Sequence, residues 1–329
     1  MYYDDPVYGT VEIDKPVILD LLNSPCMLRL KKVDQAGFLK HFRPDEDKIT
    51  RFEHSVGVFL LLKLFGASLE EQIAGLLHDV SHTAFSHCSD YLGSHDDQKK
   101  QTHQDDVFKA FVSASEIPAI LTRHKIDLDY ILNDAHFPLK ETTLPDICAD
   151  RIDYSLRTAI AAHACHDEEI QFLLQSLATD GTIWFFTSVN AALRYASLFS
   201  FLNKNHFAGL SSAVMLHTVG TVLRYSIDRG YLTHEMLYTT DDQVLETISQ
   251  YALKDPKLQR YLDRMYNKAT YTNDPEHYHA RVFCKSRVVD PLCHHEGTVD
   301  RLSFFHTDWK NHLKDEMLPK SYSIRFSDF

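Results

Sequence analysis

Four histidine and aspartate side chains have the types and the sequence setting of metal ligands. His54 lies in an apolar segment, His78-Asp79 ends a second such segment, and Asp150 precedes a third. A charged side chain buried among apolar residues is costly unless a partner neutralises it. Imidazole and carboxylate groups suit a divalent transition metal or Mg²⁺, and an ion with open coordination sites makes hydroxide available near neutral pH. The set therefore indicates a metal-dependent hydrolase.

Five motifs surround these ligands, in the following order: Asp5-Pro6-Val7-Tyr8-Gly9, Arg29-Leu30-Lys31-Lys32-Val33-Asp34-Gln35, Arg51-Phe52-Glu53-His54-Ser55-Val56-Gly57-Val58, His78-Asp79-Val80-Ser81-His82-Thr83-Ala84-Phe85-Ser86-His87 and Ala149-Asp150-Arg151-Ile152-Asp153-Tyr154-Ser155-Leu156-Arg157. Together they resemble the HD-domain phosphohydrolases, which are named for their His-Asp doublet, and within them the deoxynucleoside triphosphate (dNTP) triphosphohydrolase branch. The resemblance covers about the first 160 residues well.

The resemblance implies roles for individual residues. The metal ligands would be His54, His78, Asp79 and Asp150, binding one or more divalent ions: Mg, Mn, Fe, Co, Ni or Zn. The catalytic residues would be Arg51, which holds a phosphate, with His82 and His103, which contact phosphate and protonate the leaving oxygen. The substrate-binding residues would be Gln35, His87, Arg151, Tyr154 and His217. Tyr154 and Arg157 follow Asp150 by four and seven residues, so we expect all three side chains on one helix face that points into the pocket.

The sequence also departs from the family pattern at three places. Ser81 stands where the family often has glycine, and Thr158 follows Arg157 where an aspartate is common. The later family pattern Tyr-x-His-Lys corresponds only to Met215-Leu216-His217-Thr218, which lacks the lysine. The loss of a sugar contact and a phosphate-binding cation should weaken triphosphate binding most.

We expect hydrolysis of a dNTP to nucleoside and triphosphate, and three alternatives stay open. The first is a phosphatase of nucleoside monophosphates or another small phosphate ester. The second is a nucleotide-binding regulatory HD module without turnover, and the third is a di-iron oxygenase in which His82 and His103 supply extra ligands. Histidines and cysteines also gather near the C-terminal end of the sequence, and they could in principle bind zinc, but their spacing matches no zinc pattern. We therefore interpret this late group as a histidine-rich surface; it consists of His277, His279, Cys284, Cys293, His294 and His295.

The elements that must position these residues are mainly helical. The stretch Asp5 to Ile13 predicts a small β-hairpin, and helices are predicted over residues 17–22, 52–65, 103–115 and 145–162. Ser68 and Glu71 have capping-box spacing before a helix that should carry His78 inward. Further helices are expected over 190–203, 209–229, 241–253 and 257–268, with strands over 280–283 and 322–326. We therefore predict an HD helical core with small β elements at the N-terminus and a mixed α/β C-terminal subdomain, divided as 1–50, 51–165, 166–270 and 271–329.

The composition limits the kinds of partner that the protein is expected to bind. The chain has 34 Lys and Arg residues against 46 Asp and Glu residues, a net charge of −12, which argues against a surface built to grip nucleic acid or an anionic membrane. No apolar run approaches membrane-spanning length. The acidic start lacks the pattern of a secretory signal, so we expect a cytoplasmic protein with reduced cysteines. The expected partner is a small phosphate substrate, most simply a nucleotide, and the resemblance implies that a homo-oligomer is possible.

Overall fold

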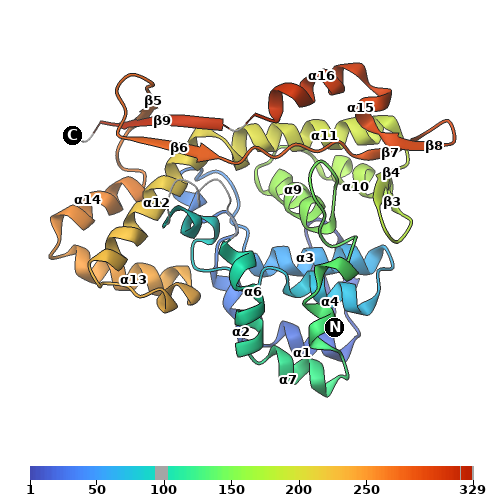
Figure 1. The fold of residues 1–329 in the computed structure, drawn as a ribbon, viewed down its shortest axis with the longest axis horizontal. Helices are drawn as coiled ribbons and strands as arrows, with labels where there is room; N and C mark the ends of the chain where they lie inside the picture. The colour runs from blue at the N-terminus through green and yellow to red at the C-terminus, as the bar shows by residue number, and fades with distance from the viewer. Residues whose placement is uncertain (93–102, 319, 328–329) are drawn as a thin grey trace.

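The computed structural model describes residues 1–92, 103–318 and 320–327, with the side chains of residues 103–106 outside the description. The fold is mainly helical, as predicted (Figure 1). The helices are α1 Pro16–Leu22, α2 Pro25–Arg29, α3 Arg51–Leu64, α4 Leu69–Leu77, α6 His103–Ala114, α7 Ile117–Arg123, α8 Leu128–Ile131, α9 Ala149–Ala161, α10 Asp167–Gln175, α11 Val189–Leu202, α12 Leu210–Asp228, α13 Asp241–Ala252, α14 Pro256–Met265, α15 Leu302–Phe305 and α16 Thr307–Glu316.

Three small sheets accompany the helices. The predicted N-terminal hairpin is present as β1 Tyr2–Asp5 and β2 Gly9–Glu12, and its first strand begins earlier than predicted. A four-stranded sheet has the order β3-β4-β7-β8, and a three-stranded sheet has the order β5-β9-β6. Their strands are β3 Leu177–Thr179, β4 Trp184–Phe186, β5 Tyr271–Asn273, β6 Ala280–Cys284, β7 Leu292–His295, β8 Thr298–Arg301 and β9 Lys320–Phe326. Only β4 and β7 pair in parallel among the described strands, with Phe185 opposite Leu292.

Capping fixes where the two helices of the His-Asp region begin. Thr50 and Glu53 form a full capping box before α3, because the Thr50 side chain accepts the Glu53 N–H and the Glu53 carboxylate accepts the Thr50 N–H. The box expected at α4 is only half present. Ser68 accepts the Glu71 N–H as expected, but the Glu71 carboxylate instead accepts the N–H groups of Leu139 and Lys140 at 2.7 and 3.0 Å. Glu71 thus joins α4 to the segment that precedes α9.

Helix α9 begins at Ala149, four residues later than predicted, because Pro145 lies in a turn closed by a hydrogen bond from the Asp146 N–H to the Thr143 carbonyl. The later onset places Asp150 in the first helical turn. A carboxylate is favoured there because the helix dipole is positive at its N-terminus.

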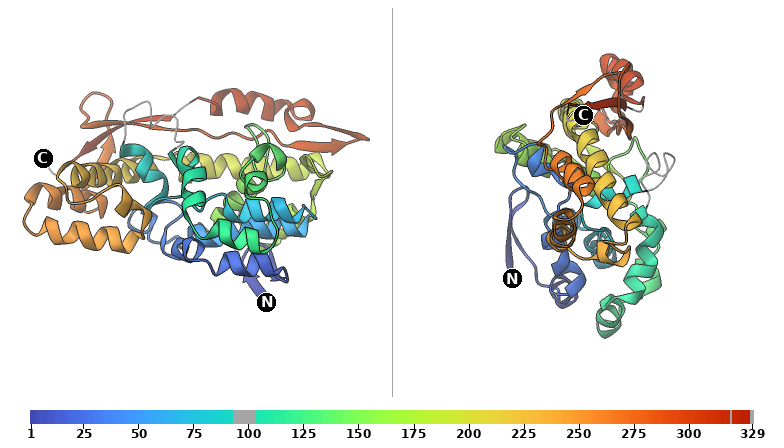
Figure 2. Two further views of the ribbon diagram at one scale, coloured as in Figure 1. Left: turned by 60° about the horizontal axis from the view of Figure 1, so that its bottom comes forward. Right: turned by 90° about the vertical axis from the view of Figure 1, so that its left-hand side faces the viewer.

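Three buried apolar clusters hold the helices together. The strands β5 to β9 with α15 and α16 form a C-terminal layer, residues 271–318 and 320–327, that runs along α11 and α12. The N-terminal hairpin and α1 lie on the opposite side of the molecule (Figures 1 and 2). One cluster joins α3, α9 and α11 to residues of the C-terminal layer, including Leu61, Ile152, Tyr195, Val289 and Trp309. This cluster contains residues from all four predicted stretches of the chain. The four-part division itself stays a prediction.

Among the described helices, none by itself combines the length and apolar character needed to cross a membrane. The bent pair Val189–Phe207 and Leu210–Asp228 passes that test only when its two parts are taken together, by length and composition alone.

The close approach of α3 to α9 depends on Gly57. A Cβ atom at this position would lie 2.0 Å from Asp153 Oδ1 and 2.1 Å from Arg157 Nη2. These two side chains form a buried ion pair, with a nitrogen–oxygen distance of 2.8 Å. The absence of a side chain at residue 57 therefore leaves the space that this pair fills.

We expect Gly57→Ala to lower the free energy of unfolding by about 1–3 kcal/mol or more, because the ion pair must move. Chemical denaturation would measure the change. Gly75→Ala in α4 is the matched control, since its added Cβ would meet chiefly the end of the flexible Leu62 side chain. Equal losses in the two variants would contradict a special role for the space at Gly57.

Candidate metal centre and substrate cleft

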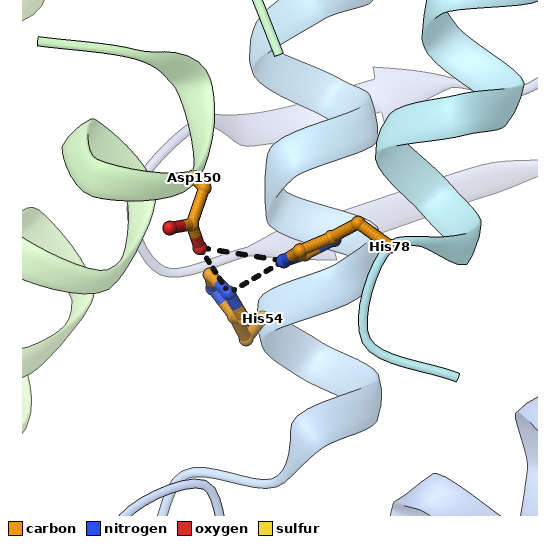
Figure 3. Close-up of side chains that lie close together, drawn as sticks. All are labelled: His54, His78 and Asp150. Carbon is orange, nitrogen blue, oxygen red and sulfur yellow. Dashed lines mark hydrogen bonds and ion pairs between the residues drawn. The ribbon is translucent and has the colours of Figure 1, made fainter. Parts of the chain in front are cut away.

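Three of the four expected metal ligands come together from three helices (Figure 3). His54 lies in the second turn of α3, His78 directly follows α4, and Asp150 lies in the first turn of α9. The Nε2 atom of His54 is 2.9 Å from Asp150 Oδ1 and 3.2 Å from His78 Nε2, and the third side of the triangle measures 3.3 Å. His54 is 1% exposed, whereas Asp150 is 21% exposed and faces the cleft.

Neighbouring acceptors fix the orientation of both imidazole rings. His54 Nδ1 donates to Asp153 Oδ2 at 2.7 Å, and His78 Nδ1 donates to the Gly75 carbonyl at 2.8 Å. In a neutral ring the other nitrogen is then an acceptor. Two acceptor nitrogens and a carboxylate oxygen therefore converge on one point, and a positive charge is needed there.

The separations fit a divalent ion. Ligand nitrogens and oxygens lie about 2.0–2.2 Å from zinc and similar ions, so neighbouring ligands around one ion are about 3 Å apart. The fourth expected ligand, Asp79, approaches from the side, with oxygens 3.5 Å from the Nε2 atoms of both histidines. His54, His78 and Asp150, with Asp79 beside them, could hold a divalent metal.

Electrostatics indicate the same need for a cation. Burial alone would lower the pKa of His54, but hydrogen bonds to Asp150 and Asp153 outweigh it and raise the pKa to about 9. Burial disfavours a charged Asp150, yet its contacts with His54 and His78 hold the pKa of Asp150 well below its usual range. Without a metal, a proton on the histidines supplies the positive charge.

Arg51 lies at the edge of the metal site and is already engaged. Its guanidinium donates to Asp79 Oδ2 at 2.5 Å, to Ser86 Oγ at 2.9 Å and to the Gln35 carbonyl at 2.9 Å. Burial opposes ionisation of Asp79, but the Arg51 charge holds the pKa of this carboxyl well below its ordinary value. Arg51 therefore orients Asp79, and the phosphate contact expected of it stays a prediction.

The other expected catalytic residues are histidines. His82 lies 3.2 Å from Asp79 Oδ1, and burial together with the Arg51 charge lowers the pKa of His82 to about 3. A neutral ring has one N–H, which His82 donates from Nε2 to the ionised Asp79, so the phosphate contact and the proton delivery expected of His82 stay predictions. His87 lines the same cleft and lies 3.2 Å from Asp90. His103 begins α6, and its side chain lies outside the described part of the structure.

A cleft of about 380 Å³ opens above the metal ligands and contains most of the expected substrate-binding residues. Gln35, Arg151 and Tyr154 line it together with His87. Gln35 Oε1 and the Tyr154 hydroxyl are buried without a hydrogen-bond partner, a costly state that a bound polar ligand or water would relieve. Arg151 is held by Glu141 and by the carbonyls of Asp146 and Thr142.

Two expected positions need correction. His217 does not line the cleft: its ring stacks on Phe326, with 6.4 Å between ring centroids, whereas the preceding α12 residues Met215 and Leu216 do line it. Successive helical residues point about 100° apart, so adjacent residues face different surroundings. Arg157 also lies away from the cleft, because it is buried against Asp153 and Asp5 two turns beyond Asp150.

Sequence reasoning did not identify Asp153 as the residue that orients His54. Asp153 also accepts hydrogen bonds from Arg157 and from the Tyr8 hydroxyl, at 2.8 and 3.0 Å to its Oδ1 atom. The Asp153–Arg157 spacing of four residues on a helix was the available signal. It identifies an ion pair but not the histidine that the pair supports.

Glu141, Cys148 and Asp150 form a second group of possible ligands among the described residues. The Arg151 side chain already contacts both Cys148 Sγ and Glu141 Oε1, at 3.2 Å each, so a cation occupies this position. Low hydration in the cleft and the nearby Asp150 charge raise the pKa of Glu141 to about 7. The late group at 277–295 is only partly a surface: its histidines are exposed, whereas Cys284 and Cys293 are buried.

Packed helices that bring His54, His78 and Asp150 together, with Asp79 beside them, are typical of a metal-dependent hydrolase. The HD domain family model matches residues 51–158. YdhJ of Bacillus subtilis, whose function is uncharacterised, is 32% identical over 294 residues, covering 88% of each chain. The metal-dependent phosphohydrolase cns2 of Cordyceps militaris is 29% identical over 295 residues, covering 87% of this chain and 83% of the relative.

Two further matches are more distant. The dNTP triphosphohydrolase SAMHD1 of Danio rerio is 28% identical over 166 residues, 43% of this chain but 26% of that relative. The crystal structure of a phosphohydrolase from Bacteroides thetaiotaomicron has the same fold, with a TM-score of 0.74 and 14% identity over 99% of this chain and 98% of that one. The chain belongs to the HD-domain metal-dependent phosphohydrolases.

We expect His78→Ala to reduce metal affinity by more than about 100-fold, and Asp153→Asn to reduce it by about 10–100-fold because His54 loses its orienting partner. Elemental analysis after dialysis against Mn²⁺ would measure both. Asp134→Ala, which removes a cleft carboxylate paired with Lys140, should retain the metal. Full metal binding by His78→Ala would rule out this ligand set.

The pH dependence of stability should differ between the metal-free and metal-bound protein. The folded-state pKa of His54 is about 9, above its ordinary value of 6.5, so the stabilisation is complete below pH 6.5 and is lost as pH rises through 9. The melting temperature of EDTA-treated protein should fall over this window. Saturating Mn²⁺ should remove most of the fall, since the ion replaces the proton. The same slope with and without metal would contradict this expectation.

Proposed function

We propose that this phosphohydrolase cleaves the phosphate monoester of a nucleotide, with nucleoside monophosphates as the preferred class. The observation that carries the proposal is the convergent ligand set of His54, His78 and Asp150 beneath a cleft of about 380 Å³. A divalent ion bound there would polarise a phosphate oxygen and lower the pKa of a bound water. The protein's part is to hold its ligands, orient the substrate and limit access of water.

Several side chains have positions suited to those tasks. Asp153 keeps the His54 Nε2 lone pair directed at the metal position, and Arg51 keeps Asp79 ionised beside it. The neutral His82 donates its one N–H to Asp79 and so helps to hold that carboxylate at the edge of the metal site. The unpartnered Gln35 Oε1 and Tyr154 hydroxyl suit a sugar hydroxyl, and Leu39, Phe207, Met215 and Leu216 offer apolar surface for a base.

The charge of the cleft favours a monophosphate. Eight Asp or Glu side chains and eight Lys or Arg side chains line it, so their formal charges cancel. A divalent ion would add two positive charges, which match the charge of about −1.5 to −2 on a phosphate monoester near neutral pH. A triphosphate carries more negative charge, and Thr218 stands where the family pattern has a lysine.

A dNTP triphosphohydrolase is the second candidate. The partial similarity to SAMHD1, whose name gives that activity, supports it. The buried polar groups suited to a sugar support both candidates equally, so the products must decide between them.

We expect the metal-loaded protein to release orthophosphate from nucleoside monophosphates with a kcat/KM at least about tenfold above that for any dNTP. Mass spectrometry of products would test monophosphates, dNTPs and sugar phosphates with Mn²⁺, Fe²⁺, Co²⁺ or Mg²⁺, and His78→Ala is the inactive control. Intact triphosphate as the main product would favour the second candidate. Tight nucleotide binding without any product would favour a regulatory HD module.

A further inference from the structure

We propose that Arg287, in the segment that joins β6 to β7, binds a phosphate oxygen of the substrate and helps determine specificity for phosphorylated ligands. The inference rests on the proposed function and adds a residue from outside the 51–158 region that matches the family model. Arg287 lines the same cleft as the metal ligands, although it lies far along the chain from them.

The backbone of Arg287 is held in place from both sides. The Asn203 side chain, which is fully buried at the end of α11, accepts the Arg287 N–H at 3.0 Å and donates to Ser286 Oγ at 3.0 Å. Ser286 Oγ donates in turn to the Glu316 carbonyl at 2.7 Å. Three residues further on, the Asp290 N–H donates to the Pro145 carbonyl at 2.9 Å. This anchoring limits the entropy lost when the side chain binds a ligand.

Most other guanidinium and ammonium groups of the cleft wall are already engaged. Arg51 is bonded to Asp79, Arg151 to Glu141, and Lys140 to Asp134. Arg43 donates to Ser211, Ser212 and the Asn205 carbonyl. By contrast, the Arg287 side chain forms no hydrogen bond or ion pair with any residue in the described ranges.

The position of Arg287 is also suited to phosphate recognition. It is half-buried, and its charge acts on Tyr154, whose hydroxyl is buried without a hydrogen-bond partner. The Tyr154 ring lies 6.5 Å from the His54 ring, so the Arg287 charge acts on a residue next to the metal ligands. Lys40 and Lys48 also line the cleft but are exposed. A half-buried guanidinium binds phosphate oxygens in a bidentate way that an exposed ammonium group cannot reproduce.

The test measures binding of inorganic phosphate and AMP to the Mn²⁺-loaded protein by calorimetry, and steady-state kinetics where turnover occurs. Arg287→Ala should weaken phosphate and AMP binding about tenfold or more and raise KM more than it lowers kcat. Arg287→Lys should retain part of the affinity. The matched control is Arg281→Ala, which removes an exposed arginine on β6 that packs over the Tyr278 ring outside the cleft and should leave both affinities unchanged.

Metal content and melting temperature would show whether each variant is folded. If Arg287→Ala does not fold, Arg287→Lys still allows the test. Unchanged phosphate affinity in a folded Arg287→Ala variant would overturn the inference, as would failure of the metal-loaded wild type to bind phosphate. If the wild type binds phosphate through Arg287 but hydrolyses no nucleotide, the proposed function fails while this inference stands.

Discussion

Two imidazole nitrogens face each other 3.2 Å apart in the interior, and the surrounding structure depends on the positive charge that this arrangement requires. Both rings have their other nitrogen committed, His54 to Asp153 and His78 to the Gly75 carbonyl, so neither can rotate away without losing a buried hydrogen bond. A proton or a metal ion can supply the charge. Metal binding is therefore an exchange of one cation for another in a site whose geometry is already set.

The charge requirement extends beyond the metal ligands. Asp153, which orients His54, is balanced by Arg157, and Arg157 is balanced by Asp5 in the N-terminal hairpin. Removing one member of such a buried chain would leave its partner uncompensated, which costs more than an exposed pair contributes. The hairpin thus belongs to the support of the metal site, although it contributes no residue to the lining of the cleft.

The sequence predicted the parts of this site that depend on local pattern. His54 and His78 lie in or beside apolar helices that form close to the expected ranges, and Asp150 lies in the first turn of the amphipathic α9, which begins four residues later than predicted. His217 was placed wrongly because a matching residue type does not reveal which face of α12 meets the cleft. The position of Arg287 in the cleft wall could not be predicted, because it depends on contacts of Asn203 and Pro145 with the segment of Arg287, which is distant from them in sequence. Tertiary packing of this kind leaves no local periodic signal.

The apolar cluster beneath α3 and α9 has a consequence for where the folding unit ends. It includes Val289, Leu302 and Trp309 together with Leu61 and Ile152, so residues 51–158 by themselves would expose much of the surface that this cluster buries. A stretch defined by family resemblance is therefore smaller than the cooperative unit that gives it stability. A substitution at Val289, Leu302 or Trp309 can therefore disturb the packing of α3 and α9, the helices that carry His54 and Asp150.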